Sequence, residues 1–348
     1  MPERPTGHRP TLEAVAARAG VSRATVSRVV NGGAGVRQPV AEKVREAVAE
    51  LGYVPNPAAR TLVTRRTGAV AVIIAEPEIR IFSDPFFSQQ IRGISKELTE
   101  NDTQLVLLLV EGPDDYDRIA RYLSGGHVDG ALAFSLHTDD PLPAIAGRIG
   151  LPTVYGGRPA WTPAPGGAAG VTYVDADNRG GAAQAVRHLI ADGRTRVAHI
   201  AGPDDQTSAT DRLDGYRDAL PATGPAMVAD GDFTVEGGAR AMARLLEHHP
   251  DLDAVFAAND QMAVGALRVL RERGRSVPED VAVVGFDDMP SVAERADPPL
   301  TTVHQDIEGM GRMMARLLLN DLDRERTAAP CAPAALITPT RLVRRASA

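Results

Sequence analysis

The segment from Thr11 to Gly32, TLEAVAARAGVSRATVSRVVNG, constrains the fold of this chain more than any other. Apolar residues recur at helical spacing after Thr11, whose hydroxyl can cap the helix that they predict. Gly20 tolerates the left-handed backbone that ends such a helix, and Ser22 can cap a second one. Two short helices joined by a glycine turn are typical of a helix-turn-helix, whose second helix enters the major groove of DNA.

The second expected helix has one apolar face and one polar face. Its valines recur at helical spacing and are expected to point inward, which leaves an outer face of Arg23, Ala24, Thr25, Ser27 and Arg28. A third helix is expected from Pro39 to about Leu51, because Pro suits a first turn and Gly52 can end the helix. A generic helical hairpin is the alternative interpretation of the first two helices alone.

The stretch YVPNPAARTLVTRRTG, residues 53–68, follows this third helix. LEAVAARAGVSRATVSRVVNG and ELGYVPNPAARTL, at this spacing, resemble the amino-terminal module of the LacI/GalR family of bacterial transcription regulators, and the likeness continues to the carboxyl end. The resemblance implies double-stranded operator DNA as a partner, contacted by Thr11, Ser22, Arg23, Ala24, Thr25, Ser27, Arg28, Asn31, Tyr53, Asn56, Ala59, Arg60 and Leu62. It also implies a hinge helix near 57–64 that orders on DNA, where Leu62 would wedge into the minor groove; an ordinary linker is the alternative.

Charge is divided unevenly along the chain. Residues 1–66 hold eleven Lys or Arg and five Asp or Glu, a net charge of +6, whereas the remainder carries −13 and the whole chain −7. A basic head on an acidic body indicates that only the head meets phosphate. Nearly all the basic residues are Arg, which suits bidentate contacts to phosphate and guanine, although a GC-rich genome produces the same bias.

From Ala69 onward, short apolar runs alternate with helical patterns. Strands are expected at 69–74, 105–110, 130–134, 153–155, 196–202, 254–258 and 281–286. Continuous apolar strands separated by helices indicate parallel sheets that are covered on both faces, so the fold class is α/β. The resemblance implies a two-lobed effector domain like that of periplasmic sugar-binding proteins.

The expected domain organisation follows from these patterns. Residues 1–56 form the helix-turn-helix head, 57–67 the hinge, and 68–348 the effector-binding and dimerisation domain. Within the last domain, the first lobe is expected to hold about 68–174 and 307–334, and the second about 175–303 and 335–343. No leucine heptad remains in 336–348, so a homodimer is expected, formed through the helix after Asp84 and the helix around Gln261–Leu270.

Ligands of open α/β sheets bind beyond the carboxyl ends of the strands, here between the lobes. Residues near such ends that match the family's motifs predict an effector site of Asp84, Phe87, Arg212, Phe233, Asn259 and Asp287. Polar groups of these kinds suit vicinal hydroxyls, and an aromatic face suits a sugar ring. An ordinary cap or turn is the alternative for each residue, above all for Asn259, which could cap a helix.

The segment Ala75–Phe87 departs from common members of the family. It is longer and more charged than their usual approach to the first helix, so Glu76 and Glu78 are expected to shape the first lobe's side of the pocket. For that reason the identity of the effector cannot be carried over from any one member.

Enzyme motifs are missing from the sequence. It holds no GxxxxGK[ST] loop, HExxH pair or GxSxG elbow, and His248-His249 is interpreted as a solvated helix end, so no catalytic residue, metal or cofactor is expected. The first residues lack a signal-peptide core, which favours the cytoplasm. The expected function is therefore a sugar-responsive repressor of sugar uptake or catabolism genes. A cytoplasmic sugar-binding protein, and a regulator that responds to a non-sugar effector or corepressor, are the alternatives.

Overall fold

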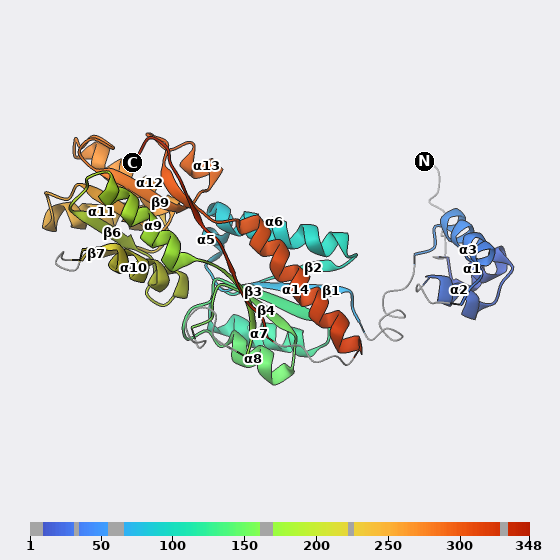
Figure 1. Cartoon of the computed structure of the whole chain (residues 1–348). Helices are drawn as coiled ribbons and strands as arrows, with labels where there is room; N and C mark the ends of the chain where they lie inside the picture. Colours follow the sequence, from blue (N-terminus) through green and yellow to red (C-terminus); the bar gives the residue numbers. More distant parts are fainter. Residues whose placement is uncertain (1–9, 31–34, 55–65, 161–169, 222–225, 328–332) are drawn as a thin grey trace, which may run out of the picture. The chain divides into compact units, whose positions relative to one another are not determined.

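The computed structural model describes residues 10–30, 35–54, 66–160, 170–221, 226–327 and 333–348, shown in Figure 1. Five expected DNA contacts, and with them most of the expected hinge, lie outside the described residues: Asn31, Asn56, Ala59, Arg60 and Leu62. The chain divides into two compact units, residues 1–67 and 68–348.

The first unit contains three helices, α1 (Leu12–Ala19), α2 (Arg23–Val30) and α3 (Gln38–Leu51). The Ala14 amide donates to the Thr11 hydroxyl at 3.2 Å and the Thr25 amide to the Ser22 hydroxyl at 3.1 Å, so both expected caps are present. Gly20 and Gly52 end α1 and α3 with φ of 65° and 61°, in the left-handed region. The three helices enclose a small core around Val15, Val26 and Val44.

The second unit contains two six-stranded sheets. The first has the order β11-β5-β4-β3-β1-β2, with bounds β1 Ala69–Ile74, β2 Gln104–Leu109, β3 Gly130–Phe134, β4 Thr153–Gly156, β5 Thr172–Ala176 and β11 Ala335–Thr338. The second has the order β12-β10-β9-β8-β6-β7, with bounds β6 Val197–Ala201, β7 Met227–Asp230, β8 Ala254–Ala257, β9 Ala282–Asp287, β10 Thr301–His304 and β12 Arg341–Val343. All strand pairs are parallel except β10–β12, which confirms the predicted α/β class.

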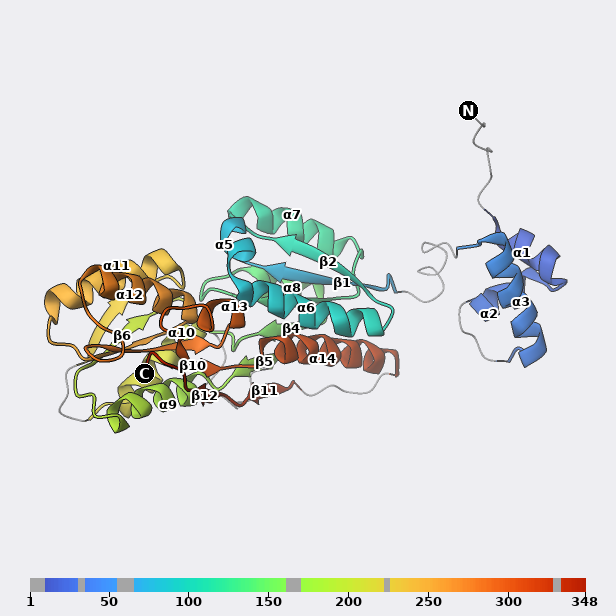
Figure 2. The ribbon, with the colours of Figure 1, turned by 90° about the horizontal axis from the view of Figure 1, so that it is seen from above.

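Helices cover both faces of each sheet, as Figures 1 and 2 show. Their bounds are α5 Glu78–Ser83, α6 Pro85–Glu100, α7 Pro113–Ser124, α8 Leu142–Ile149, α9 Asn178–Ala191, α10 Thr207–Ala219, α11 Val235–His248, α12 Asp260–Glu272, α13 Pro290–Ala293 and α14 Ile307–Thr327. In the first lobe, α6 and α14 pack on one face and α7 and α8 on the other. In the second lobe, α11 and α12 oppose α9 and α10. No described helix is long and apolar enough to cross a membrane.

Strand β1 shows why its sequence is apolar throughout. Val70 and Val72 face the cluster formed with α6 and α14, whereas Ala71 and Ile73 face the cluster formed with α7 and α8. All four side chains are at most 1% exposed. A strand buried on both faces must be apolar at every position, which explains the run AVAVII.

The chain passes between the sheets three times, between β5 and α9, between β10 and α14, and between β11 and β12. The expected lobe boundary was wrong for residues 335–338. Strand β11 pairs in parallel with β5, from Ala335 beside Tyr173 to Thr338 beside Ala176, and so belongs to the first sheet. The second sheet is joined later, where Arg341 begins β12.

Helices α6 and α14 approach each other closely at two glycines. A Cβ atom on Gly93 would lie 2.0 Å from the Glu308 carbonyl oxygen, and one on Gly311 would lie 2.4 Å from the Gln90 carbonyl oxygen. Side chains at these positions would push the two backbones apart. The contact positions α6 and therefore the residues at its amino end, which reach the site described below.

The substitution Gly93→Ala is expected to lower the free energy of unfolding by about 1–3 kcal/mol, because a methyl group has no space at this contact. Chemical denaturation of the full chain measures the effect. Gly147→Ala is the matched control: it also lies inside a helix, with no atom within 4 Å of the added Cβ, so it should be neutral or raise stability by up to about 1 kcal/mol. Equal effects of the two substitutions would contradict the close approach.

Candidate functional site

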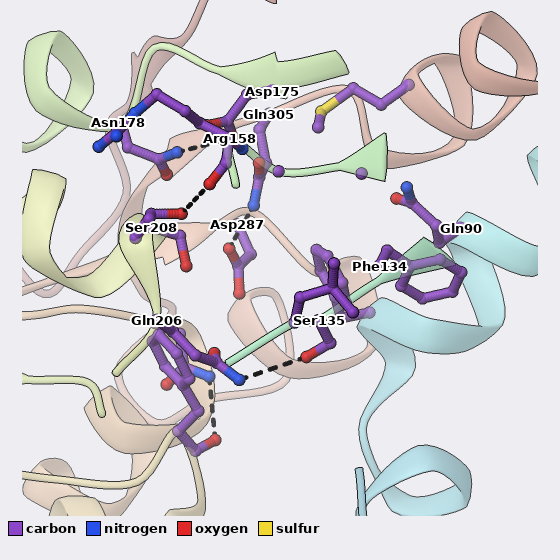
Figure 3. Close-up of a pocket in the computed structure, with 18 of the residues that line it drawn as sticks. Gln90, Phe134, Ser135, Arg158, Asp175, Asn178, Gln206, Ser208, Asp287 and Gln305 are labelled. Atoms are coloured by element: carbon purple, nitrogen blue, oxygen red, sulfur yellow. Dashed lines mark hydrogen bonds between the residues drawn. The ribbon is translucent and has the colours of Figure 1, made fainter. Parts of the chain in front are cut away.

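A cavity with an empty volume of about 820 Å³ lies where strands of both sheets end. This volume includes open solvent at the mouth of the cavity. The six residues that the sequence predicts for an effector site all line it: Asp84, Phe87, Arg212, Phe233, Asn259 and Asp287. Figure 3 shows Asp287 in the middle of the view, with Gln90 and Phe134 on one side and Arg158, Asp175 and Asn178 on another.

Arg212 on α10 is 5% exposed and is held from several directions. Its Nε donates to Asn178 Oδ1 at 2.9 Å and its Nη1 to the Ala258 carbonyl oxygen at 2.6 Å. The guanidinium carbon lies 3.8 Å from the centroid of the Phe286 ring, a cation–π contact. These contacts use Nε and Nη1, which leaves Nη2 of the guanidinium for a ligand.

Asp287 ends β9 and faces Arg212 across the cavity wall. The Asp287 Oδ1 atom accepts from Gln305 Nε2 at 2.6 Å and lies 3.6 Å from Arg212 Nη1. Burial nevertheless raises the pKa of Asp287 to about 7, because the loss of hydration outweighs the stabilisation by Arg212. Its backbone φ of 103° is in the left-handed region, which marks a strained residue of the kind that clusters at functional sites.

Two predicted site residues also act as helix caps. Asn259 Oδ1 accepts from the Met262 amide at 2.9 Å, and its Nδ2 donates to the Phe233 carbonyl oxygen at 3.0 Å. Asp84 Oδ1 accepts from the Phe86 amide at 3.0 Å at the start of α6. The capping alternative therefore describes the contacts of Asn259, and its amide keeps one N–H and one oxygen lone pair for a ligand.

Sequence reasoning missed much of the cavity wall. Beyond the six predicted residues, its polar side chains include Arg80, Gln90, Ser135, Arg158, Asp175, Asn178, Gln206, Thr207, Ser208 and Gln305. A signal was available for several of them, because Ser135, Asp175 and Gln305 lie at or just after the carboxyl ends of β3, β5 and β10. Applying the strand-end rule to every strand, rather than to the family's motifs alone, finds them.

The charged segment before α6 differs from expectation. Glu78 is exposed, and its amide donates to Glu111 Oε1 at 2.9 Å, so it does not line the cavity. Glu76 is 3% exposed and lies behind the cavity wall. The residue of this segment that lines the cavity is Arg80 on α5.

A polar cluster joins the two lobes beside the cavity. Glu76 Oε1 accepts from Ser135 Oγ at 2.6 Å in the first lobe and from Gln206 Nε2 at 2.7 Å in the second. His137 Nδ1 lies 2.7 Å from Asp205 Oδ2, and His137 Nε2 lies 3.6 Å from Glu76 Oε1. The nearby Glu76 carboxylate, with further support from Asp205, raises the pKa of His137 to about 9 although burial opposes it. At neutral pH a histidinium therefore links one carboxylate from each lobe.

The His137→Gln substitution is expected to lower the unfolding temperature by roughly 2–4 °C at pH 6 and to have little effect near pH 10. A histidine whose pKa rises on folding stabilises the protein fully below its unfolded value of 6.5, and this stabilisation is lost as the pH rises through about 9. Thermal unfolding across this pH range measures the change. The control is His127→Gln, which changes an exposed histidine stacked on Tyr122. If the difference in unfolding temperature between the wild type and His137→Gln were the same at every pH, the ion pair would be contradicted.

The head presents the outer face that the sequence predicts. Arg23, Ala24 and Arg28 on α2 are exposed, whereas Val26 is buried. Arg23 Nε lies 3.2 Å from Glu13 Oε1, and both side chains are more than half exposed, so this pair costs little to exchange for another partner. Arg28 has no ion pair among the described residues.

Both units of the chain are similar to known proteins. A family model of bacterial regulatory proteins, lacI family, matches residues 11–56, and a periplasmic binding protein-like domain matches residues 186–348. The chain is 50% identical over 343 residues to the HTH-type transcriptional regulator CelR of Thermobifida fusca, covering 97% of this chain and 98% of that protein. It is 35% identical over 315 residues to the ribose operon repressor of Escherichia coli strain K12, covering 89% and 92%.

Solved structures show the same architecture. A transcriptional regulator CelR–cellobiose complex superposes with a TM-score of 0.76 at 48% identity, covering 98% of this chain and all of that one. The Lac repressor dimer bound to operator and the anti-inducer ONPF superposes with a TM-score of 0.81 at 28% identity, covering 98% and 99%. With its helix-turn-helix head and two-lobed domain, the chain belongs to the LacI family of bacterial transcriptional regulators.

Proposed function

We propose that this chain is a repressor that binds operator DNA as a homodimer and is controlled by a neutral sugar, a disaccharide such as cellobiose, in the cavity between its lobes. The observation that carries the effector class is the charge balance of the cavity wall. A sugar-binding protein without a DNA target is the alternative, and the basic head with an exposed arginine face on α2 argues against it.

Each cationic side chain that lines the cavity, among the described residues, already has an acidic partner. Arg80 pairs with Glu76 at 2.6 Å, Arg158 with Asp211 at 2.6 Å, and Arg212 with Asp287 at 3.6 Å. An anionic effector such as a sugar phosphate would compete with these carboxylates for the guanidinium groups. Neutral hydroxyl groups can instead donate to carboxylates and accept from guanidinium groups, while aromatic rings cover the apolar face of a sugar.

The relatives narrow the choice of sugar. CelR, 48% identical in the solved complex, holds cellobiose, whereas the ribose operon repressor is 35% identical. The higher identity to the cellobiose-bound regulator supports a β-linked disaccharide.

An apolar patch on the first lobe supports a dimer. Strand β2 is the edge of the first sheet, and Phe82, Ile91 and Leu107 line a groove there, with Phe82 69% exposed. The apolar face of α12, expected to contribute as well, is consumed within its own lobe: Met262, Ala266 and Leu270 are fully buried. We therefore propose that the dimer contact lies at this patch. We also propose that the regulator acts in the cytoplasm and has no catalytic role.

Calorimetry and thermal unfolding with cellobiose test the effector class. At a concentration of 100 times its Kd, the sugar should stabilise the protein by about 2.7 kcal/mol, and Arg212→Ala should lose this response because a donor at the cavity wall is removed. Operator binding by the variant should remain, which shows that the head is intact. Saturable binding of a phosphorylated sugar but not of cellobiose would refute the neutral-sugar proposal.

The substitution Arg28→Ala tests base reading by α2. A bidentate arginine–guanine pair discriminates between bases by about 1–3 kcal/mol, so the variant should lose preference for the operator while retaining much of its affinity for random DNA. Arg45→Ala, which removes an exposed arginine from α3 and changes the net charge equally, is the control. The test is a DNA titration of both variants at one fixed salt concentration. If both lose the same affinity for operator and for random DNA, Arg28 contacts only phosphate.

A further inference from the structure

Helix α5 brings a guanidinium group to the cavity from the charged segment before α6. Arg80 lines the cavity with its side chain 14% exposed. Its guanidinium carbon lies 5.8 Å from the ring centroid of Phe87 in the first lobe and 5.4 Å from that of Phe233 in the second. The group is therefore flanked by aromatic rings from both lobes, and both rings line the same cavity.

The position of Arg80 is set by a buried carboxylate. Arg80 Nη1 lies 2.6 Å from Glu76 Oε2, one helical turn earlier, and Glu76 Oε1 is occupied by Ser135 and Gln206. These partners, together with His137, lower the pKa of Glu76 in spite of its burial. The carboxylate stays ionised at neutral pH, and the guanidinium beside it is held in one orientation at the wall.

Two polar atoms on this side of the cavity are buried without a partner in the part of the chain that the structure describes: Arg80 Nε and Gln90 Oε1. Gln90 is 1% exposed, and its Nε2 reaches only Met314 Sδ at 3.0 Å, a weak acceptor. The surrounding wall, with Phe134 and Met310, is apolar. A buried donor and a buried acceptor in an apolar wall favour a ligand that offers both functions, as a sugar hydroxyl does.

We propose that Arg80 and Gln90 form a first-lobe subsite for the effector, in which Arg80 donates to an oxygen of one sugar unit and Gln90 accepts from a hydroxyl of the same unit. This inference rests on the proposed function, because it deepens the assignment of the cavity to a neutral sugar. Arg212 and Asp287 hold the part of the sugar that faces the second lobe. Glu76 binds both Arg80 in the first lobe and Gln206 in the second. A sugar bound to Arg80 therefore affects the hydrogen bond by which Glu76 links the two lobes.

Calorimetric titration of cellobiose into the full chain tests the subsite with two variants. Arg80→Met removes the donors and should raise the Kd by about tenfold or more. Arg80→Lys keeps the positive charge beside Glu76 but lacks the guanidinium Nε. This variant should also bind cellobiose more weakly, and without sugar it should unfold at the same temperature as the wild type. The control is Arg118→Met, an exposed arginine of α7 paired with Asp115, which should bind cellobiose as the wild type does.

The outcomes separate the two proposals. Wild-type protein that binds cellobiose, with an unchanged Kd in Arg80→Met or in Arg80→Lys, overturns the subsite and leaves the neutral-sugar effector standing. Wild-type protein that binds neither cellobiose nor another neutral disaccharide overturns both. Weakened binding in both Arg80 variants, with a normal control and a normal unfolding temperature in Arg80→Lys, supports the subsite.

Discussion

The meeting of the carboxyl ends of two parallel sheets is the constraint on which the site depends. Polar residues that follow the strands are brought into a shared space and lose water, so each must find a partner. Arg212 and Asp287 show the result: the guanidinium is shared among Asn178, a backbone carbonyl and an aspartate whose pKa burial raises to about 7. A ligand rich in hydroxyl groups can add to such a network without breaking it.

Contacts between the lobes use the same chemistry just outside the cavity. Gln206 joins Glu76, and His137 joins Asp205, so hydrogen bonds and an ion pair link the two lobes here. Such contacts can be exchanged at a modest free-energy cost. Coupling between an effector site and a DNA site requires two arrangements of the domain whose balance a ligand shifts, and lobe contacts of this kind are compatible with that requirement.

The charged segment of residues 75–87 has a definite structural consequence. Part of it forms α5, and through this helix Arg80 lines the cavity while Glu78 remains at the surface. The sequence singled out Glu76, which holds the lining residues Arg80, Ser135 and Gln206, but it also named Glu78 and did not name Arg80. Which side of a six-residue helix faces a cavity depends on how that helix packs, and here the buried carboxylate of Glu76 determines it.

By itself the sequence determined the fold class and many of the elements, because local chemistry specifies them: Thr11 and Ser22 cap helices, Gly20 and Gly52 end them, and apolar runs such as AVAVII become strands buried on both faces. Motifs at strand ends also identified six residues that line one cavity. Tertiary structure alone decided the rest. Contacts between segments far apart in the chain decide three features: the sheet that β11 joins, the face of α12 that is buried in its own lobe, and the partner of each cavity arginine. No local pattern encodes these contacts.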